Sequence, residues 1–383
     1  MKTILVVICI TLAILTGCID KKTVDQSTLQ IKLDSLITEE HLANKFDGTI
    51  VIGTTDTVLF QKAIGTANRV WEVPIRMDSR FNICSVNKSF IAALILIAVE
   101  ENKVSLTDQL VDLLGQYEYD GMFSDKITIH HMLTHTSGLT HYEGVADDLK
   151  ADNFLKFKRM HLTNDEYVNL ISQVPPVSEP GQQFSYSSFA YHLLSIILQD
   201  IYQLSFNELL DQKICQPLEL RETINIVSNQ ALTPNLVEGY QLNESKNKWY
   251  RNEFLDMSIG TNICSTSMDL YEWGKAMNDN SLLTDRSLRI MQTNHLAAIT
   301  ADLSYGYGWA VFDQKGEYGM GNLEIDKKYI IHGGNWSGYK SMLVNIEQGE
   351  YIIAFLANTG DQTNEMKLTK KIVQILINSE NDK

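Results

Sequence analysis

Basic residues are scarce in this chain of 383 residues, which holds 32 Lys and Arg against 47 Asp and Glu and has a formal net charge of −15. A protein of this charge repels a phosphate backbone, which argues against nucleic acid as a partner. Cysteine is also rare. Beyond residue 20 only Cys84, Cys215 and Cys264 remain, an odd and widely spaced set that does not form a disulfide framework. We expect these three side chains to be small and buried.

Long apolar runs are absent after the first twenty residues, so the sequence predicts no later membrane-spanning helix. Repeats and low-complexity tracts are absent as well. The composition, 44% hydrophobic and 21% charged, is that of a globular protein whose core is large enough to keep water out of a catalytic cleft. We expect one large domain or two in intimate contact.

The first twenty residues indicate export. An apolar run from Ile4 to Leu15 follows Lys2 and is too short to span a bilayer as a mature helix. The run ends in Leu15-Thr16-Gly17-Cys18, which resembles the lipobox of bacterial lipoproteins, where the thiol that follows the cleavage site is acylated. Cleavage there would leave Cys18 as the point of lipid attachment. An uncleaved anchor, or a signal without lipid, is the alternative.

The resulting boundaries are a signal peptide over residues 1–17, a polar tether over 18–30 and one domain over 31–380. The expected partner is therefore a membrane, reached through the lipid anchor, on the periplasmic or extracellular side of a bacterial envelope. The residue after the cysteine is Ile19 and not an acidic residue. By resemblance to lipoprotein sorting signals, this favours attachment to the outer membrane if the cell has one. The sequence does not indicate an oligomeric state.

Hydrophobic periodicity predicts a sheet built from both ends of the chain. The middle, to about residue 280, is mostly helical, with a polar, aromatic-rich surface excursion near residues 240–250. Strand-like runs lie at 48–53, 57–60, 328–332, 339–346 and 351–357, and helical patterns lie at about 29–44, 89–100 and 362–378. The predicted class is α/β (α+β), one antiparallel sheet flanked by helices, with a largely helical inserted subdomain.

Ser85-Val86-Asn87-Lys88 is a Ser-x-x-Lys arrangement, which at a helix start places the ammonium one turn beyond the hydroxyl on the same face. An amine held there can accept the serine proton. Two further matches begin at Ser245 and Ser337, so the motif alone is weak. Ser85 alone opens a buried helix, which separates it from the other two.

Around Ser85 the sequence Phe81-Asn82-Ile83-Cys84-Ser85-Val86-Asn87-Lys88-Ser89-Phe90 resembles the nucleophile segment of class C β-lactamases and related D-alanyl-D-alanine carboxypeptidases, D-aminopeptidases and esterases. The resemblance covers about residues 48 to 359. It continues in order through residues 127–139, Pro180-Gly181, 184–188, 264–266, 269–270, Tyr305-Gly306-Tyr307-Gly308-Trp309 and His332-Gly333-Gly334. It implies the penicillin-recognising fold and a serine hydrolase that needs no metal or organic cofactor.

The resemblance also implies the roles of individual residues. Ser85 would attack a carbonyl while Lys88 and Tyr186 accept and relay its proton, and the backbone N–H groups of Ser85 and Asn335 would hold the oxyanion. Two positions depart from the family pattern. Ser188 replaces the asparagine of Tyr-x-Asn and cannot offer the donor and acceptor pair of a carboxamide.

The second departure is His332-Gly333-Gly334, which stands in the place of Lys-Thr-Gly and would line the substrate cleft. A histidine can be neutral near pH 7, so less positive charge meets a substrate carboxylate. We therefore expect a hydrolase of esters or D-amino-acid peptide amides rather than an efficient β-lactamase. The expected substrate is a small molecule or a peptidoglycan-like compound. A non-catalytic module that binds cell-wall fragments or a protein partner is the alternative.

The same sequence offers residues for two other chemistries. His131 and His135 would share a helix face at i and i+4, the spacing of a metal pair, and His130 and His141 lie nearby. The glutamate of His-Glu-x-x-His is absent, so we expect no metal. Cys84 has no histidine partner in the motif set and is expected to be buried rather than nucleophilic.

Overall fold

A six-stranded antiparallel sheet forms the centre of the molecule, with the strand order β10-β11-β12-β13-β1-β2. The computed structural model describes residues 21–150, 156, 160–228, 232–251, 261–313, 321–336 and 338–381. The strands of this sheet are β1 Gly48–Gly53, β2 Val58–Ile64, β10 Ala310–Phe312, β11 Tyr329–Trp336, β12 Tyr339–Ile346 and β13 Tyr351–Ala357. The sheet thus joins the first strands of the chain to the last ones.

Helices and small sheets surround it. The helices are α1 Lys21–Leu42, α2 Asn87–Glu100, α3 Leu110–Leu113, α4 Ile129–Leu133, α6 Asn164–Ser172, α7 Ser188–Tyr202, α8 Phe206–Leu210, α9 Ser267–Lys275, α10 Asp285–Met291 and α11 Glu365–Asn381. Among the short turns, η1 spans Cys84–Val86 and η4 spans Glu244–Lys246. The minor sheets pair β3 Thr66–Asn68 with β4 Val73–Pro74, β9 Ile263–Ser265 with β5 Phe81–Asn82 and β6 Ile224–Asn225, and β7 Tyr240–Asn243 with β8 Lys248–Arg251.

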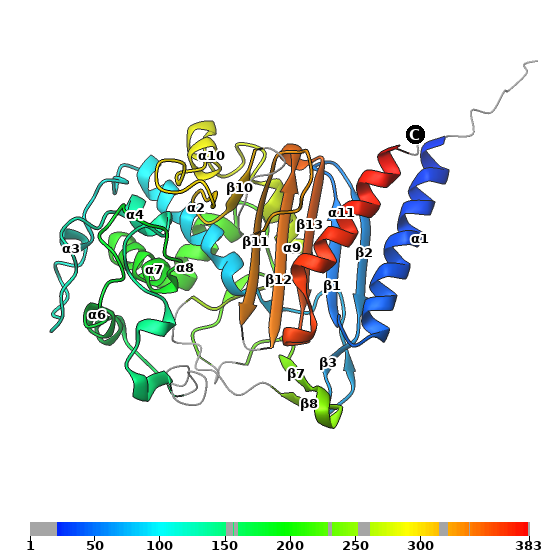
Figure 1. The fold of residues 1–383 in the computed structure, drawn as a ribbon, viewed down its shortest axis with the longest axis horizontal. Helices are drawn as coiled ribbons and strands as arrows, with labels where there is room; N and C mark the ends of the chain where they lie inside the picture. Colours follow the sequence, from blue (N-terminus) through cyan, green and yellow to red (C-terminus); the bar gives the residue numbers. More distant parts are fainter. Residues whose placement is uncertain are drawn as a thin grey trace, which may run out of the picture.

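Both faces of the large sheet are buried. Helices α1 and α11 pack against one face, and α9 packs against the other, beyond which the helical region around α2 and α7 extends (Figure 1). On β12, Leu343 belongs to the apolar core on the α9 side, whereas Met342 and Val344 belong to the core under α1 and α11. Strands β1, β12 and β13 are buried at every position, and β1 and β13 are therefore largely apolar at successive positions rather than at alternate ones.

Helix α2 runs through the middle of the helical region, and its residues from Lys88 to Ala98 are all buried. It packs against α7 and α10. Phe90 stacks on Trp273 of α9 with ring centroids 4.2 Å apart, and the Trp273 indole N–H donates to Ser89 Oγ at 2.9 Å. These contacts lock the start of α2, and with it the segment that carries Ser85, against the sheet side of the molecule.

The predicted fold class is confirmed, as are the hairpin of β1 and β2, the buried helix α2, the three late strands and the last helix. Cys84, Cys215 and Cys264 are buried and free. The stretch near residues 240–250 forms the β7-β8 hairpin. In the part of the chain that the structure describes, no helix is both long and apolar enough to span a bilayer.

The first helix begins earlier in the chain than the sequence predicted. Helix α1 begins at Lys21, so the polar residues predicted as a tether are helical from that residue onward. Leu29 and Leu33 are buried in the core under α1 and α11, which explains why the helix packs on the sheet. Cys18 and the predicted signal peptide lie outside the described residues, and the role of residues 18–30 as a link to a membrane stays a prediction.

Candidate active site

Ser85 lies in the short turn η1, between strand β5 and helix α2. Strand β5 is fixed by pairing with β9, and Ile83 N donates to Ile263 O at 3.0 Å. Cys84 has a φ of +52°, a left-handed conformation that is uncommon for a residue with a side chain. Its N–H donates to Asn82 Oδ1 at 2.7 Å, and this bond holds the sharp turn that presents Ser85 at the helix start.

Strand β11 approaches this turn very closely at Gly334. A Cβ placed on Gly334 would lie 2.6 Å from Cys84 Cβ and 2.8 Å from Ser85 N. No residue with a side chain fits there without moving the backbone of the turn. The glycine of the His-Gly-Gly motif therefore allows the strand edge and the Ser85 backbone to line one space.

Lys88 is 3% exposed and reaches back toward Ser85 from the first turn of α2. Its Nζ lies 3.5 Å from Ser85 Oγ and 3.3 Å from Ser188 Oγ. Burial lowers the pKa of Lys88 from 10.5 to about 7, because the charged form loses its hydration. At neutral pH about half of the lysine side chains are thus unprotonated and can accept a proton from the serine.

Tyr186 lies against both residues. Its side chain is hydrogen-bonded to Ser85, and its ring centroid is 4.9 Å from Lys88 Nζ. Burial raises the pKa of the Tyr186 phenol well above its usual range, so the phenol keeps its proton at neutral pH. Tyr186 can therefore relay a proton between Ser85 and Lys88, whereas Lys88 is the group able to store it.

His135 supports Tyr186 from behind. The two rings lie 4.3 Å apart, and His135 Nδ1 accepts the backbone N–H of Ser187 at 3.0 Å. Ser187 in turn caps α7 by accepting from Ala190 N. This arrangement fixes the tyrosine and the start of α7, including Ser188, relative to Lys88.

His332 lies on β11 and is 5% exposed. Its Nδ1 is 2.7 Å from Gly333 O and its Nε2 is 3.1 Å from the Tyr305 hydroxyl. A carbonyl only accepts, so Nδ1 carries the proton and Nε2 accepts from the tyrosine. Burial, together with the nearby Lys88, lowers the pKa of His332 to about 3, and the ring is neutral. A neutral ring agrees with the reduced positive charge that the sequence predicted for this position.

Two cavities flank Ser85, one of about 240 Å³ and one of about 300 Å³. Ser85, His141 and Asn335 line both. The smaller cavity extends toward Lys88, Ser188, Tyr167 and Thr261, and the larger one extends toward Tyr186, Tyr305, His332, Gly333, Gly334, Met342 and Glu365. A substrate whose carbonyl carbon meets Ser85 Oγ has space on both sides of the scissile bond.

The structure brings all the predicted site residues together, apart from Cys18, which lies outside the described residues. Asn335 lies on the β11 edge beside Ser85. Its N–H as a second oxyanion donor stays a prediction. The sequence did not point to Glu365, which is 280 residues from Ser85, nor to His141 as a lining residue, because only the tertiary fold places either of them at the cavity.

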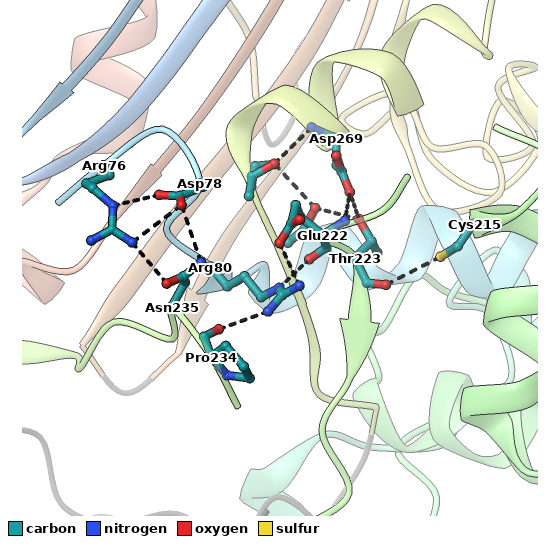
Figure 2. A network of polar contacts seen from close by, with 11 residues as sticks. Arg76, Asp78, Arg80, Cys215, Glu222, Thr223, Pro234, Asn235 and Asp269 are labelled. Carbon is teal, nitrogen blue, oxygen red and sulfur yellow. Dashed lines mark hydrogen bonds and ion pairs between the residues drawn. The ribbon is translucent and has the colours of Figure 1, made fainter. Parts of the chain in front are cut away.

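A polar network joins the start of β5 to the segments around β6 and α9 (Figure 2). Arg80 donates to Glu222 O and Pro234 O, each at 2.9 Å, and pairs with the Glu222 carboxylate at 2.6 Å. Asp269 of α9 accepts from Glu222 N at 2.9 Å and from Thr223 Oγ1 at 2.8 Å. The network ties the residue that precedes β5 to β6 and α9, so it restrains the strand that leads to Ser85.

The helix face that His131 and His135 were expected to share does not exist. Helix α4 ends at Leu133, and His135 has a φ of +58°, so His131 and His135 do not share a helix face. His131 belongs instead to the capping box of α4 with Thr128. Among the described residues no group of three or more His, Cys, Asp or Glu side chains is arranged to hold a metal ion.

Comparison with known proteins gives a family match over most of the chain. The family model described as Beta-lactamase matches residues 36–376. Penicillin-binding protein 4* of Bacillus subtilis (strain 168) is 23% identical over 351 residues, which cover 87% of this chain and 73% of that protein. Esterase EstB of Burkholderia gladioli is 27% identical over 207 residues, about half of each chain (52% and 52%).

Solved structures show the same fold. The octameric penicillin-binding protein homologue from Pyrococcus abyssi superposes with a TM-score of 0.74 at 23% identity, over 91% of this chain and 77% of that one. A D-amino acid amidase from Ochrobactrum anthropi SV3 superposes with a TM-score of 0.73 at 19% identity, over 92% and 99%. At these identities the structural matches establish the fold, and the chemistry has to be argued from the site.

Proposed function

The chain belongs to the beta-lactamase family, and from this premise we propose that it is a serine hydrolase that forms an acyl-enzyme on Ser85. The observation that carries the proposal is the buried Lys88 ammonium, 3.5 Å from Ser85 Oγ, with a pKa of about 7. No described residue forms an ion pair with Lys88, and a buried lysine without a counter-ion is costly for stability and useful as a base.

We propose a reaction in two steps that uses these contacts. Ser85 Oγ attacks the carbonyl carbon, and its proton passes to Lys88, directly or through Tyr186. The negative charge that develops on the carbonyl oxygen is held by the backbone N–H groups of Ser85 and Asn335. The C–O or C–N bond then breaks, and the leaving group takes the proton. A water molecule attacks the acyl-enzyme by the same route in reverse and frees Ser85.

We further propose that the substrate is an ester or a D-amino-acid amide rather than a β-lactam. The names of relatives support this choice, because they include an esterase and a D-amino acid amidase. So does the site, since the neutral His332 offers no fixed cation to a substrate carboxylate and Ser188 offers no carboxamide. The second candidate, a non-catalytic module that binds cell-wall fragments, has no use for a deprotonated Lys88.

The experiment compares wild-type protein with Ser85→Ala on a short-chain 4-nitrophenyl ester, a D-amino acid amide and a chromogenic cephalosporin. Ser245→Ala is the matched control, because Ser245 opens another Ser-x-x-Lys match in the exposed turn η4. We expect Ser85→Ala to abolish hydrolysis with an unchanged circular dichroism spectrum, and Ser245→Ala to retain it. Equal turnover by Ser85→Ala and wild type would reject the assignment of the nucleophile.

Lipid anchoring is a separate proposal, which rests on the lipobox-like segment that ends at Cys18. In a bacterial host, metabolic labelling with a palmitate analogue is expected to label the full chain and not the Cys18→Ser variant. If both are labelled, or neither, the anchor at Cys18 is rejected without any consequence for the hydrolase assignment.

A further inference from the structure

We propose that the cavity between β11 and α11 selects substrates that carry a positive charge, and that Glu365 is the residue that binds this charge. The inference rests on the proposed function, because it concerns the substrate of the same Ser85 site. It adds a specificity that neither the family membership nor the Ser85 geometry supplies.

Glu365, the first residue of α11, lines the same cavity of about 300 Å³ as Ser85. It lies beside the strand that presents the oxyanion side of the site: a Cβ placed on Gly333 would be 3.8 Å from Glu365 Cγ. Any group of the substrate that extends from the scissile bond along β11 toward α11 therefore approaches this carboxylate.

Positive charge is missing from the described residues that line this cavity. Its other titratable side chains are His332, which is neutral, His141, and the two phenols Tyr186 and Tyr305, whose pKa values burial raises. Lys88 lines the neighbouring cavity, and its charge is weakened by a pKa of about 7. A substrate carboxylate in the larger cavity would face Glu365, and the described lining residues hold no fixed cation to offset it.

Lys340 reduces the negative charge of Glu365 without removing it. Its Nζ lies 3.4 Å from Glu365 Oε2 and 3.6 Å from Asp361 Oδ1, so one ammonium serves two carboxylates and the group has a formal charge of −1. The Lys340 side chain is 9% exposed and belongs to β12 outside the cavity lining, whereas the Glu365 side chain is 25% exposed. An ammonium of the substrate would bring the group to neutrality.

The amino end of α11 does not favour an anionic substrate over a cationic one. The start of a helix attracts anions through its free N–H groups. Here Asn364 Oδ1 accepts the Lys367 N–H at 2.9 Å, and Glu365 itself supplies a negative charge to the first turn. The helix end is thus already compensated, and a second anion would meet repulsion.

The rest of the lining suits an alkylammonium group. Ile331, Met342 and Met366 provide an apolar surface for an alkyl stem, and the Tyr305 ring, which also lines the cavity, can face a cation. Apolar walls with one carboxylate and an aromatic ring are a chemical match for a quaternary or primary ammonium on a short chain. The combination discriminates against the carboxylate-bearing analogue of the same length.

The test uses matched esters that differ only in charge. Acetylcholine, its uncharged isostere 3,3-dimethylbutyl acetate and an acetate ester whose alcohol bears a carboxylate at the same distance vary the leaving group. Three 4-nitrophenyl esters whose acyl chains end in trimethylammonium, tert-butyl or carboxylate vary the acyl side. The readout is the ratio of kcat/KM for the cationic ester to that for its isostere, in wild type, Glu365→Gln and Asp361→Asn, the second carboxylate paired with Lys340.

We expect the cationic member of at least one series to be favoured over its isostere by about fivefold or more, as for a partly desolvated cation beside a carboxylate and an aromatic face. Glu365→Gln is expected to bring that ratio close to one, and Asp361→Asn to lower it less, because Asp361 shares Lys340 with Glu365 but does not line the cavity. A preference for the carboxylate ester, or a ratio that Glu365→Gln leaves unchanged, would overturn the inference.

A second measurement separates a failure of this inference from a failure of the proposed function. The rate at which Ser85 is phosphonylated is measured with a thiocholine phosphonate and its uncharged isostere, so that the charge preference is visible even if none of the esters turns over. Phosphonylation of Ser85 without a preference for the cationic reagent rejects only the role of Glu365. No reaction of Ser85 with any ester or phosphonate rejects the hydrolase assignment and this inference with it.

Discussion

Replacing Lys88 with methionine should make the protein inactive and more stable at the same time. Methionine has a similar length and no charge, so it can occupy the buried space beside Ser85 and Ser188 without desolvating an ammonium. The hydrogen bonds that are lost are long, 3.5 and 3.3 Å, and contribute little. The dominant change in the free energy of unfolding is therefore the removal of an ionisable group from a buried position.

The magnitude follows from the pKa of Lys88, which falls from 10.5 in the unfolded chain to about 7 in the fold. Since one pKa unit corresponds to about 1.4 kcal/mol, the wild-type protein gives up about 4 kcal/mol of stability at pH 7 that it would keep with a neutral side chain. Allowing for imperfect packing of the methionine, we expect Lys88→Met to raise the free energy of unfolding by about 2–4 kcal/mol at pH 7.

The pH dependence of the free energy of unfolding tests the sign of this effect. Between about pH 7 and 10.5 the unfolded lysine holds more protons than the folded one, so the stability of the wild type rises with pH and the advantage of Lys88→Met shrinks. The assay is urea denaturation of both proteins at pH 7, 8.5 and 10, followed by tryptophan fluorescence. If Lys88→Met is no more stable than the wild type at pH 7, or if the difference does not depend on pH, the assignment of Lys88 as a buried neutral base is wrong.

Three further predictions use other features of the site. The neutral form of Lys88 is the base, so kcat/KM should rise about tenfold between pH 6 and 8, with an apparent pKa of about 7; a flat profile would argue for another base. Gly334→Ala should slow phosphonylation of Ser85 by at least about tenfold, because the new Cβ would lie 2.8 Å from Ser85 N. The rate is measured from timed, quenched samples, and a wild-type rate would show that β11 can move away from Ser85 without loss of activity. Arg80→Ala should lower the free energy of unfolding by about 2–3 kcal/mol, since Glu222 and two carbonyls lose their partner; a urea-denaturation loss below about 0.5 kcal/mol would mean that the network of Figure 2 is not structural.

The sequence was sufficient for much of the fold because its signals are local. The strands from Gly48 and from Tyr329 onward are runs of apolar and β-branched residues, and α2 is an apolar run too long for a strand. Ser85 and Lys88 could be paired from spacing alone, because one helical turn separates them. That strands from both ends share a sheet also followed from their order along the chain.

Features that depend on the tertiary fold could not be predicted. The positive φ values of Cys84 and His135 arise from contacts with Asn82 and from the end of α4, and no local pattern marks them. The prediction of a shared helix face for His131 and His135 was wrong because a capping box limits α4 to five residues. Glu365 lines the same cavity as Ser85 only because α11 packs over the sheet, which no short-range signal encodes.

The most direct test of the central claim is intact-mass spectrometry of the soluble domain after incubation with a fluorophosphonate and, separately, with a penicillin, in wild type and Ser85→Ala. The account predicts a mass gain from the phosphonate in wild type and none in Ser85→Ala, with little or no adduct from the penicillin. A phosphonate adduct that persists in Ser85→Ala, or no adduct in the folded wild type, would contradict the assignment of Ser85 as an activated nucleophile.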